Sequence, residues 1–221
     1  MGQKERRKLS ADQAQKYDLE IEFFDAVDGK RLEQDARHAH YDEIRNKKYF
    51  KRPLANGEIA CYLSHLALWK RIAQGADDYA LILEDDFEFI GDPTPFFQQL
   101  ANKKIEDVMI KIDGVPRQKD LPIAEQLDEI ALVRADIIPA RTTGYLIGRN
   151  AAALMHKSRS RFCRTVDNDI KHHWEYEVPV LVAVPQLVRE RDDNDSGLDA
   201  SRKAFRSGNA VRRFLRNLLY Q

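Results

Sequence analysis

The sequence has few cysteines, no long apolar run and no excess of charge of either sign. Its 221 residues include only two cysteines, Cys61 and Cys163, which lie far apart and form no CxxC pair. Neither a disulfide framework nor a zinc site is therefore predicted, and a reducing compartment is expected. The 36 basic residues equal the 36 acidic residues in number. A neutral chain lacks the surplus of cations that gives a general nucleic-acid binder its affinity for phosphate, so no nucleic-acid partner is expected.

Apolar segments long enough to cross a membrane are also missing. The longest uncharged apolar run, Val178 to Val188, is too short to span a bilayer, so we interpret it as one buried strand. The first residues, MGQKERRKLSADQ, lack the apolar centre of a signal peptide. We expect a cytoplasmic protein, either free or peripheral on the inner face of the cytoplasmic membrane.

The neutral total conceals an asymmetry between the two ends of the chain. Residues 201–221 carry six basic residues and no acid, so residues 1–200 carry a net charge of −6. We predict a domain over residues 1–200 and a basic amphipathic tail over 201–221. The tail's apolar residues, from Val211 to Leu219, recur at helical spacing, which suits an anionic membrane surface or docking onto the protein's own core. Both interpretations remain open at this point.

Apolar runs and helical patterns alternate along the first 200 residues, and no internal repeat is seen. The predicted strands are 20–27, 79–83, 108–112, 130–133, 143–147 and 178–188, and the predicted helices are 30–52 in part, 56–75, 93–100, 150–157 and 167–176. The continuous apolar run YALIL at 79–83 is typical of a central strand that helices cover on both faces. This alternation predicts an α/β fold with a mostly parallel or mixed sheet flanked by helices.

Acidic residues accumulate directly after YALIL. Seven acids and no basic residue lie between Asp77 and Asp92, and three of the acids, Glu84, Asp85 and Asp86, are consecutive. In an extended chain Glu84 and Asp86 point to one face, where a hard cation such as Mn²⁺ or Mg²⁺ would relieve their repulsion and leave positions for a diphosphate. The alternative is a solvated acidic turn.

Three further groups are candidates for ligand contacts, each with an ordinary structural alternative. The helix that begins at Gly57 and Glu58 offers Ser64 and His65 to a nucleotide, or it is a plain amphipathic helix. Two carboxylates in the VDND segment provide a general base or simply cap a helix. These carboxylates are Asp167 and Asp169. The third group is Thr142, Thr143 and Gly144, which lie in a polar segment that also suits an ordinary turn.

Several segments in order resemble glycosyltransferase family 25, the group of bacterial lipooligosaccharide galactosyltransferases to which collagen galactosyltransferase domains are related. The segments are ERR (5–7), IEFFDAVDG (21–29), GEIACYLSHLALWK (57–70), YALILEDDFEF (79–89), TTGYLIGRNAA (142–152), VDND (166–169) and VPQLV (184–188). The resemblance covers residues 5–196 and is far more specific than any single motif.

The resemblance implies a GT-A type, Rossmann-like fold and an inverting transferase, most simply a β-galactosyltransferase. The donor would be a UDP-sugar such as UDP-galactose, and the acceptor a lipid-linked oligosaccharide of the lipooligosaccharide or lipopolysaccharide type. Glu84 and Asp86 would then contact the metal and the diphosphate, and Asp85 the ribose or sugar of the donor. The helix from Gly57 and the TTGY segment would line the donor and acceptor sites. Asp167 becomes the leading candidate for the base, with Asp169 as the alternative.

The sequence departs from this family at its beginning. Members open with a short apolar strand before the ERR segment, whereas only Met1 to Lys4 precede Glu5 here. That strand helps to hold the nucleotide base in GT-A folds. A second hypothesis is therefore a weakly active or inactive scaffold that keeps the fold and is recruited to the membrane by its basic tail.

Overall fold

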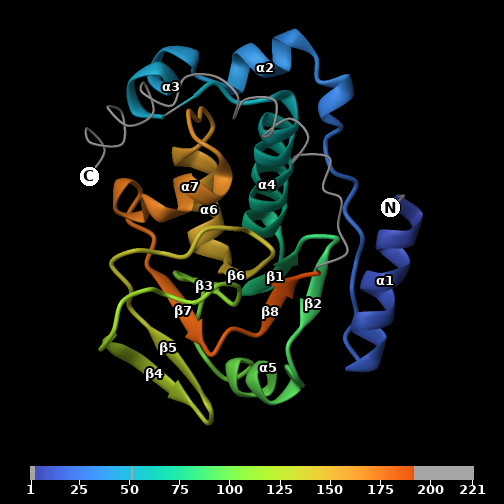
Figure 1. Ribbon diagram of the computed structural model, residues 1–221, viewed down its shortest axis with the longest axis vertical. Coiled ribbons are helices and arrows are strands. Elements are labelled where there is room, and N and C mark those ends of the chain that lie inside the picture. Colours follow the sequence, from blue (N-terminus) through green and yellow to red (C-terminus); the bar gives the residue numbers. More distant parts are fainter. Residues whose placement is uncertain (1–2, 51, 192–221) are drawn as a thin grey trace.

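The computed structural model describes residues 3–50 and 52–191, whose helices and strands are shown in Figure 1. The helices are α1 (Gln3–Lys16), α2 (Gln34–His40), α3 (Glu43–Tyr49), α4 (Asn56–Gln74), α5 (Thr94–Leu100), α6 (Arg149–Ser158) and α7 (Val166–Lys171), with short 3-10 helices η1 (Gly29–Arg31) and η2 (His173–Glu175). The strands are β1 (Tyr79–Leu83), β2 (Phe87–Phe89), β3 (Met109–Lys111), β4 (Ile123–Leu127), β5 (Ile130–Val133), β6 (Gly144–Gly148), β7 (Val180–Val184) and β8 (Val188–Glu190). The predicted basic tail at 201–221 lies outside the described residues.

Six of the strands form one mixed sheet in the order β1-β6-β3-β7-β5-β4. Strands β3 and β7 are parallel, while the other neighbouring pairs of this sheet are antiparallel. Strands β2 and β8 form a separate antiparallel pair. The predicted α/β fold with a mixed sheet is confirmed, but the expectation that β1 is central is wrong, because β1 is an edge strand of the six-stranded sheet.

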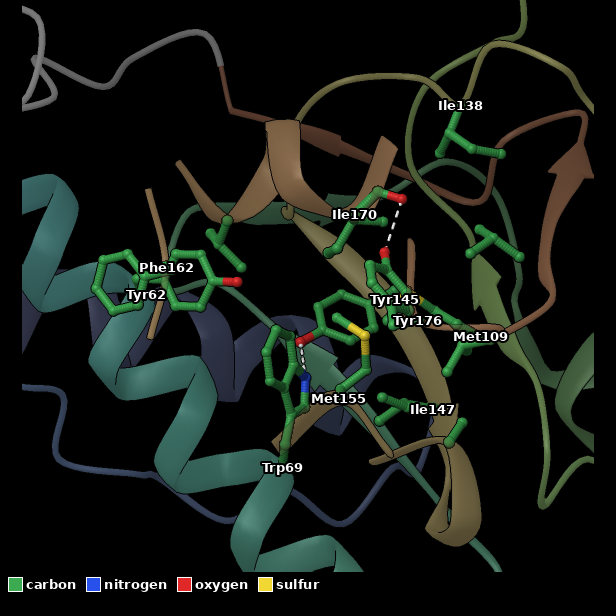
Figure 2. Packing of buried hydrophobic residues seen from close by; sticks show 14 of the residues in the cluster. Tyr62, Trp69, Met109, Ile138, Tyr145, Ile147, Met155, Phe162, Ile170 and Tyr176 are labelled. Atoms are coloured by element: carbon green, nitrogen blue, oxygen red, sulfur yellow. Dashed lines mark hydrogen bonds between the residues drawn. The ribbon is translucent and has the colours of Figure 1, made fainter. Parts of the chain in front are cut away.

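The two faces of the sheet are covered by different layers. On one face, residues of α4, α6 and α7 pack with alternate residues of the strands, among them Trp69 against Tyr145 and Ile147 (Figure 2). On the other face, α5 and the β2–β8 pair cover the residues in between, such as Ile110 and Leu146. This alternation follows from the two-residue period of a strand, and it buries both faces of the central strands.

Most of the elements expected from periodicity are present with shifts of one or two residues at their ends. The predicted strand at 20–27 is wrong, because this segment runs extended without a strand partner and leaves Phe23 and Val27 exposed. The predicted strand at 178–188 divides into β7 and β8 around Pro185, which has no N–H for a sheet hydrogen bond. Sequence periodicity predicts neither α1, which has few apolar residues, nor the short strands β2 and β4.

No helix within residues 3–50 and 52–191 is both long enough and apolar enough to span a membrane.

Gly148, the last residue of β6, provides a test of how closely the sheet packs against the loop that precedes β3. A Cβ atom at this position would lie 2.1 Å from the Ile105 carbonyl oxygen, so backbone would have to move. We expect Gly148→Ala to lower the free energy of unfolding by about 3 kcal/mol. Gly75→Ala is the matched control, because its Cβ would meet no atom closer than 3.4 Å. Urea denaturation measures both, and equal stabilities would contradict this packing argument.

Candidate active site

The three acidic residues after β1 lie in different surroundings. The chain turns at Asp85 and Asp86 into β2, so it is not extended here and the simple one-face geometry assumed for Glu84 and Asp86 is wrong. Glu84 is held by the segment before β6, because its N–H donates to the Thr143 carbonyl oxygen over 3.0 Å and its carboxylate accepts a hydrogen bond from the Thr142 hydroxyl. Both threonines are buried.

Asp85 and Asp86 differ in how their carboxylates are satisfied. Asp85 pairs with Arg6 of α1, with the Arg6 Nη1 atom 3.3 Å from Asp85 Oδ1. Asp86 is buried, and its Oδ1 atom has no hydrogen-bond partner among the described residues. The Asp86 carboxylate is thus the better placed of the two for an external cation.

Burial and neighbouring negative charge raise the pKa values of Glu84 and Asp86. The pKa of Glu84 is raised to about 7. Burial is the main cause, the negative charges of Asp86 and Asp113 contribute, and the hydrogen bond from Thr142 opposes them. Burial also raises the pKa of Asp86, with further contributions from Glu190 and Asp85. A cation would stabilise the ionised form of such carboxylates, because its positive charge offsets both burial and repulsion.

A buried ion pair at the end of β3, Lys111–Asp113, was missed from the sequence. The two side chains are 0% and 1% exposed, and Lys111 Nζ lies 2.8 Å from Asp113 Oδ1. The ammonium group also donates a hydrogen bond to the Arg141 carbonyl oxygen. Neither Asp113 oxygen has a well-aligned hydrogen bond from a described residue. The available signal was a lysine inside the apolar run VMIKI, which has to find a partner when the strand is buried.

His65 lies on α4 beside these acids. Its Nδ1 atom is 2.7 Å from the Tyr145 hydroxyl, which accepts a hydrogen bond from Trp69 Nε1 over 2.9 Å. The pKa of His65 is lowered to about 4, mainly by burial and also by the charge of Lys111, with Asp167 opposing both, so the ring is neutral at pH 7. The ligand atoms of Cys61, His65 and Glu84 all lie within 4.8 Å of one another.

The two aspartates of α7 have separate surroundings. Asp169 is 2% exposed and forms ion pairs with Arg159 and Arg164, and the Tyr62 hydroxyl donates a hydrogen bond to it. Asp167 is partly exposed, and its negative charge opposes the lowering of the His65 pKa. Burial raises the pKa of Asp167, but hydrogen bonds from Thr165 and Asn168 outweigh burial and lower it. Asp167 is therefore ionised at pH 7 and, unlike Asp169, is not enclosed by Arg159 and Arg164. Its role as the base stays a prediction.

The remaining residues singled out on the first half of α4 and on β6 have evident structural contacts. Glu58 accepts a hydrogen bond from the Ala55 N–H and pairs with Arg52. Ser64 binds the extended segment at the Val27 N–H, 2.9 Å away. Gly57 packs against Gly29, and a Cβ at Gly144 would lie 2.6 Å from a Val188 methyl group. Their contacts with a donor or acceptor stay predictions, as does that of Asp85.

Three carboxylates near the ends of β1 and β3 have the chemistry of ligands for a hard divalent cation, although among the described residues the ligand atoms that converge within 4.8 Å are those of Cys61, His65 and Glu84. Glu84, Asp86 and Asp113 offer carboxylate oxygens, the ligands that Mn²⁺ and Mg²⁺ prefer. Two of these residues have buried oxygens without a hydrogen-bond partner in the described chain, and two have raised pKa values. A cation would supply the missing positive charge.

Comparison with known proteins identifies the class of this mixed α/β protein. Residues 2–170 match the model of "Glycosyltransferase family 25 (LPS biosynthesis protein)". The chain belongs to glycosyltransferase family 25, as the ordered motifs indicated.

Curated relatives support the same class. A "Glycosyltransferase 25 family member" of Aedes aegypti is 32% identical over 106 residues, which are 47% of this chain and 17% of that protein. "Procollagen galactosyltransferase 1-B" of Xenopus laevis is 31% identical over 152 residues, 62% of this chain and 24% of the relative. A "Putative glycosyltransferase" of Haemophilus influenzae is 33% identical over 84 residues, 38% of this chain and 29% of the relative. The chain thus spans less than a third of the length of these relatives.

The raised pKa of Glu84 predicts a specific pH dependence of stability. Between its ordinary pKa of 4.5 and about 7, the folded protein keeps a proton that the unfolded chain has lost, so the free energy of unfolding falls as pH rises. Glu84→Gln removes this contribution. Between pH 4.5 and pH 7.5 we expect the free energy of unfolding of the native chain to fall by about 2 kcal/mol more than that of Glu84→Gln. This value is reduced for solvent screening because Glu84 is partly exposed.

Urea denaturation at the two pH values measures this difference. Glu129→Gln, in the exposed turn between β4 and β5, is the control and should follow the native chain. Parallel pH profiles for the native chain and Glu84→Gln would exclude a strongly raised pKa.

The contrast between the two aspartates of α7 is also testable. Asp169→Asn removes a charge from buried Arg159 and Arg164, so we expect it to lower the free energy of unfolding by about 3 kcal/mol. Asp167→Asn should cost less than about 1 kcal/mol, because an amide oxygen still accepts the same hydrogen bonds. Thermal or urea denaturation compares the variants, and a larger loss for Asp167→Asn would reverse the assignment.

Proposed function

We propose that this chain is an inverting glycosyltransferase that moves a hexose, galactose, from a UDP-sugar to a lipooligosaccharide or lipopolysaccharide acceptor. The observation that carries the proposal is a set of partly to fully buried carboxylates near the ends of β1 and β3, two with raised pKa values and two with oxygens that lack a hydrogen-bond partner among the described residues, in a member of glycosyltransferase family 25. The names of the procollagen relatives support galactose, and the family description supports a lipopolysaccharide acceptor.

In this proposal the acidic residues at the strand ends hold Mn²⁺ or Mg²⁺. Glu84, Asp86 and Asp113 would provide its ligands, and such a cation offsets the charge of the donor diphosphate and of the leaving UDP. Thr142 fixes one Glu84 oxygen through its hydrogen bond. Lys111 balances part of the acidic charge and keeps Asp113 at the end of β3.

Asp167 acts as the general base. It is ionised at pH 7, is partly exposed and acts on His65 through its charge, so it can receive a proton from an acceptor hydroxyl at the site. The acceptor oxygen attacks the anomeric carbon from the side opposite UDP, its proton passes to Asp167, and the bond between the sugar and UDP breaks with the electron pair going to UDP. Attack from the opposite face inverts the anomeric centre.

The charge on Asp86 is central to this proposal and can be removed with little change in shape. We expect Asp86→Asn to lower Mn²⁺-dependent turnover of UDP-galactose by about 100-fold and to weaken Mn²⁺ binding at least about tenfold. Asp77→Asn, an exposed acid of the same acidic stretch, is the control and should retain both. Turnover is measured by UDP release, and metal affinity by calorimetry.

Unchanged Mn²⁺-dependent turnover in Asp86→Asn would overturn the metal assignment. Failure of the native chain to bind UDP or any UDP-sugar would overturn the transferase and favour the scaffold hypothesis. That hypothesis further requires salt-sensitive binding to anionic vesicles that disappears when residues 201–221 are deleted. Among the base candidates, Asp167→Asn should lose turnover while retaining UDP binding.

A further inference from the structure

Two residues of α4 that the proposed reaction does not use lie next to Glu84 and have the chemistry of metal ligands. Cys61 and His65 are four residues apart, so their side chains share one face of the helix. That face meets the end of β1, where the ligand atoms of Cys61, His65 and Glu84 lie within 4.8 Å of one another. Thiol, imidazole and carboxylate thus converge on one point.

This combination of atoms favours a different cation from the oxygen site formed with Asp86 and Asp113. Thiolate and imidazole ligands select Zn²⁺ and chemically similar ions, whereas Mn²⁺ and Mg²⁺ prefer oxygen alone. Bond lengths of about 2.3 Å to sulfur and about 2.0 Å to nitrogen imply ligand atoms about 3.5 Å apart. Side-chain movements of about 1 Å are enough to bring the three ligand atoms to bonding distance around one ion.

The surroundings of His65 prepare it for this role. The ring is neutral at pH 7, so one nitrogen carries a lone pair. The Tyr145 hydroxyl, 2.7 Å from His65 Nδ1, can accept the Nδ1–H hydrogen bond together with that of Trp69, which leaves Nε2 for a cation. Metal-binding histidines commonly have such a partner on their second nitrogen, because it fixes the orientation of the ring.

We propose that Cys61, His65 and Glu84 form a binding site for Zn²⁺, with the fourth tetrahedral position left to water. On binding, the Cys61 S–H bond breaks, the proton passes to solvent and a sulfur–zinc bond forms. Glu84 belongs also to the proposed Mn²⁺ or Mg²⁺ site, so Zn²⁺ would remove one ligand from that site. This last consequence rests on the proposed function, but zinc binding itself does not.

Cobalt is a suitable probe, because Co²⁺ replaces Zn²⁺ and its bond to a thiolate absorbs in the near ultraviolet. The full chain, freed of metal with a chelator, should develop this thiolate-to-cobalt band with one equivalent of Co²⁺, and Zn²⁺ should abolish it. Cys61→Ser should lose the band and bind Zn²⁺ at least about tenfold more weakly. Cys163→Ser is the matched control, because Cys163 is the second cysteine, is buried and does not belong to the group of converging ligand atoms. It should retain both.

Absence of the band in the native chain, or an equal band in Cys61→Ser, would overturn the proposal. A second measurement requires no variant: one equivalent of Zn²⁺ should slow alkylation of Cys61 at least about tenfold, as read by peptide mapping, and an unchanged rate would also overturn it. Asp86→Asn separates this proposal from the preceding one. It should retain the cobalt band while losing Mn²⁺-dependent turnover, so either proposal can fail without the other.

Discussion

Tyr145, buried at the centre of β6, bonds through its hydroxyl to both Trp69 and His65 and so joins α4 to the sheet. A buried phenol hydroxyl needs partners, and these two are available only when α4 crosses the sheet at one register. This contact places Cys61 and His65 over the end of β1. Figure 2 shows the hydrogen bond between Trp69 and Tyr145 that fixes α4 against β6.

The candidate site concentrates negative charge on partly and fully buried side chains. Lys111 is wholly buried among Glu84, Asp113 and the Arg141 carbonyl group, and it offsets only part of that charge. Elsewhere the fold neutralises its buried acid completely, as Arg159 and Arg164 do for Asp169. Incompletely balanced charge of this kind is more typical of ligand sites than of ion pairs that stabilise a fold, which is why the proposed metal site is assigned to this cluster.

How much could be read from the sequence depended on the range of the interaction concerned. The helix at 56–75 and the strands at 79–83 and 130–133 were predictable, because periodicity and breaking residues act within a few positions. The strand at 20–27 was not, since its apolar residues suit a strand but no neighbouring strand accepts it. The family resemblance made Asp167 the leading candidate for the base with Asp169 as the alternative, and the arginines packed around Asp169 add a physical difference between them.

The sequence by itself determined the family, the alternation of helices and strands, and the acidic run Glu84 to Asp86, because these are properties of neighbouring residues and of ordered motifs. Tertiary structure decided which acids share an environment. It brought Asp113 and Lys111 to Glu84 and gave Cys61 two further ligand groups, although cysteine spacing had indicated no zinc site. The physical reason is that pKa values and metal coordination depend on distances through space. These distances are set only when distant strands pair and α4 packs on the sheet.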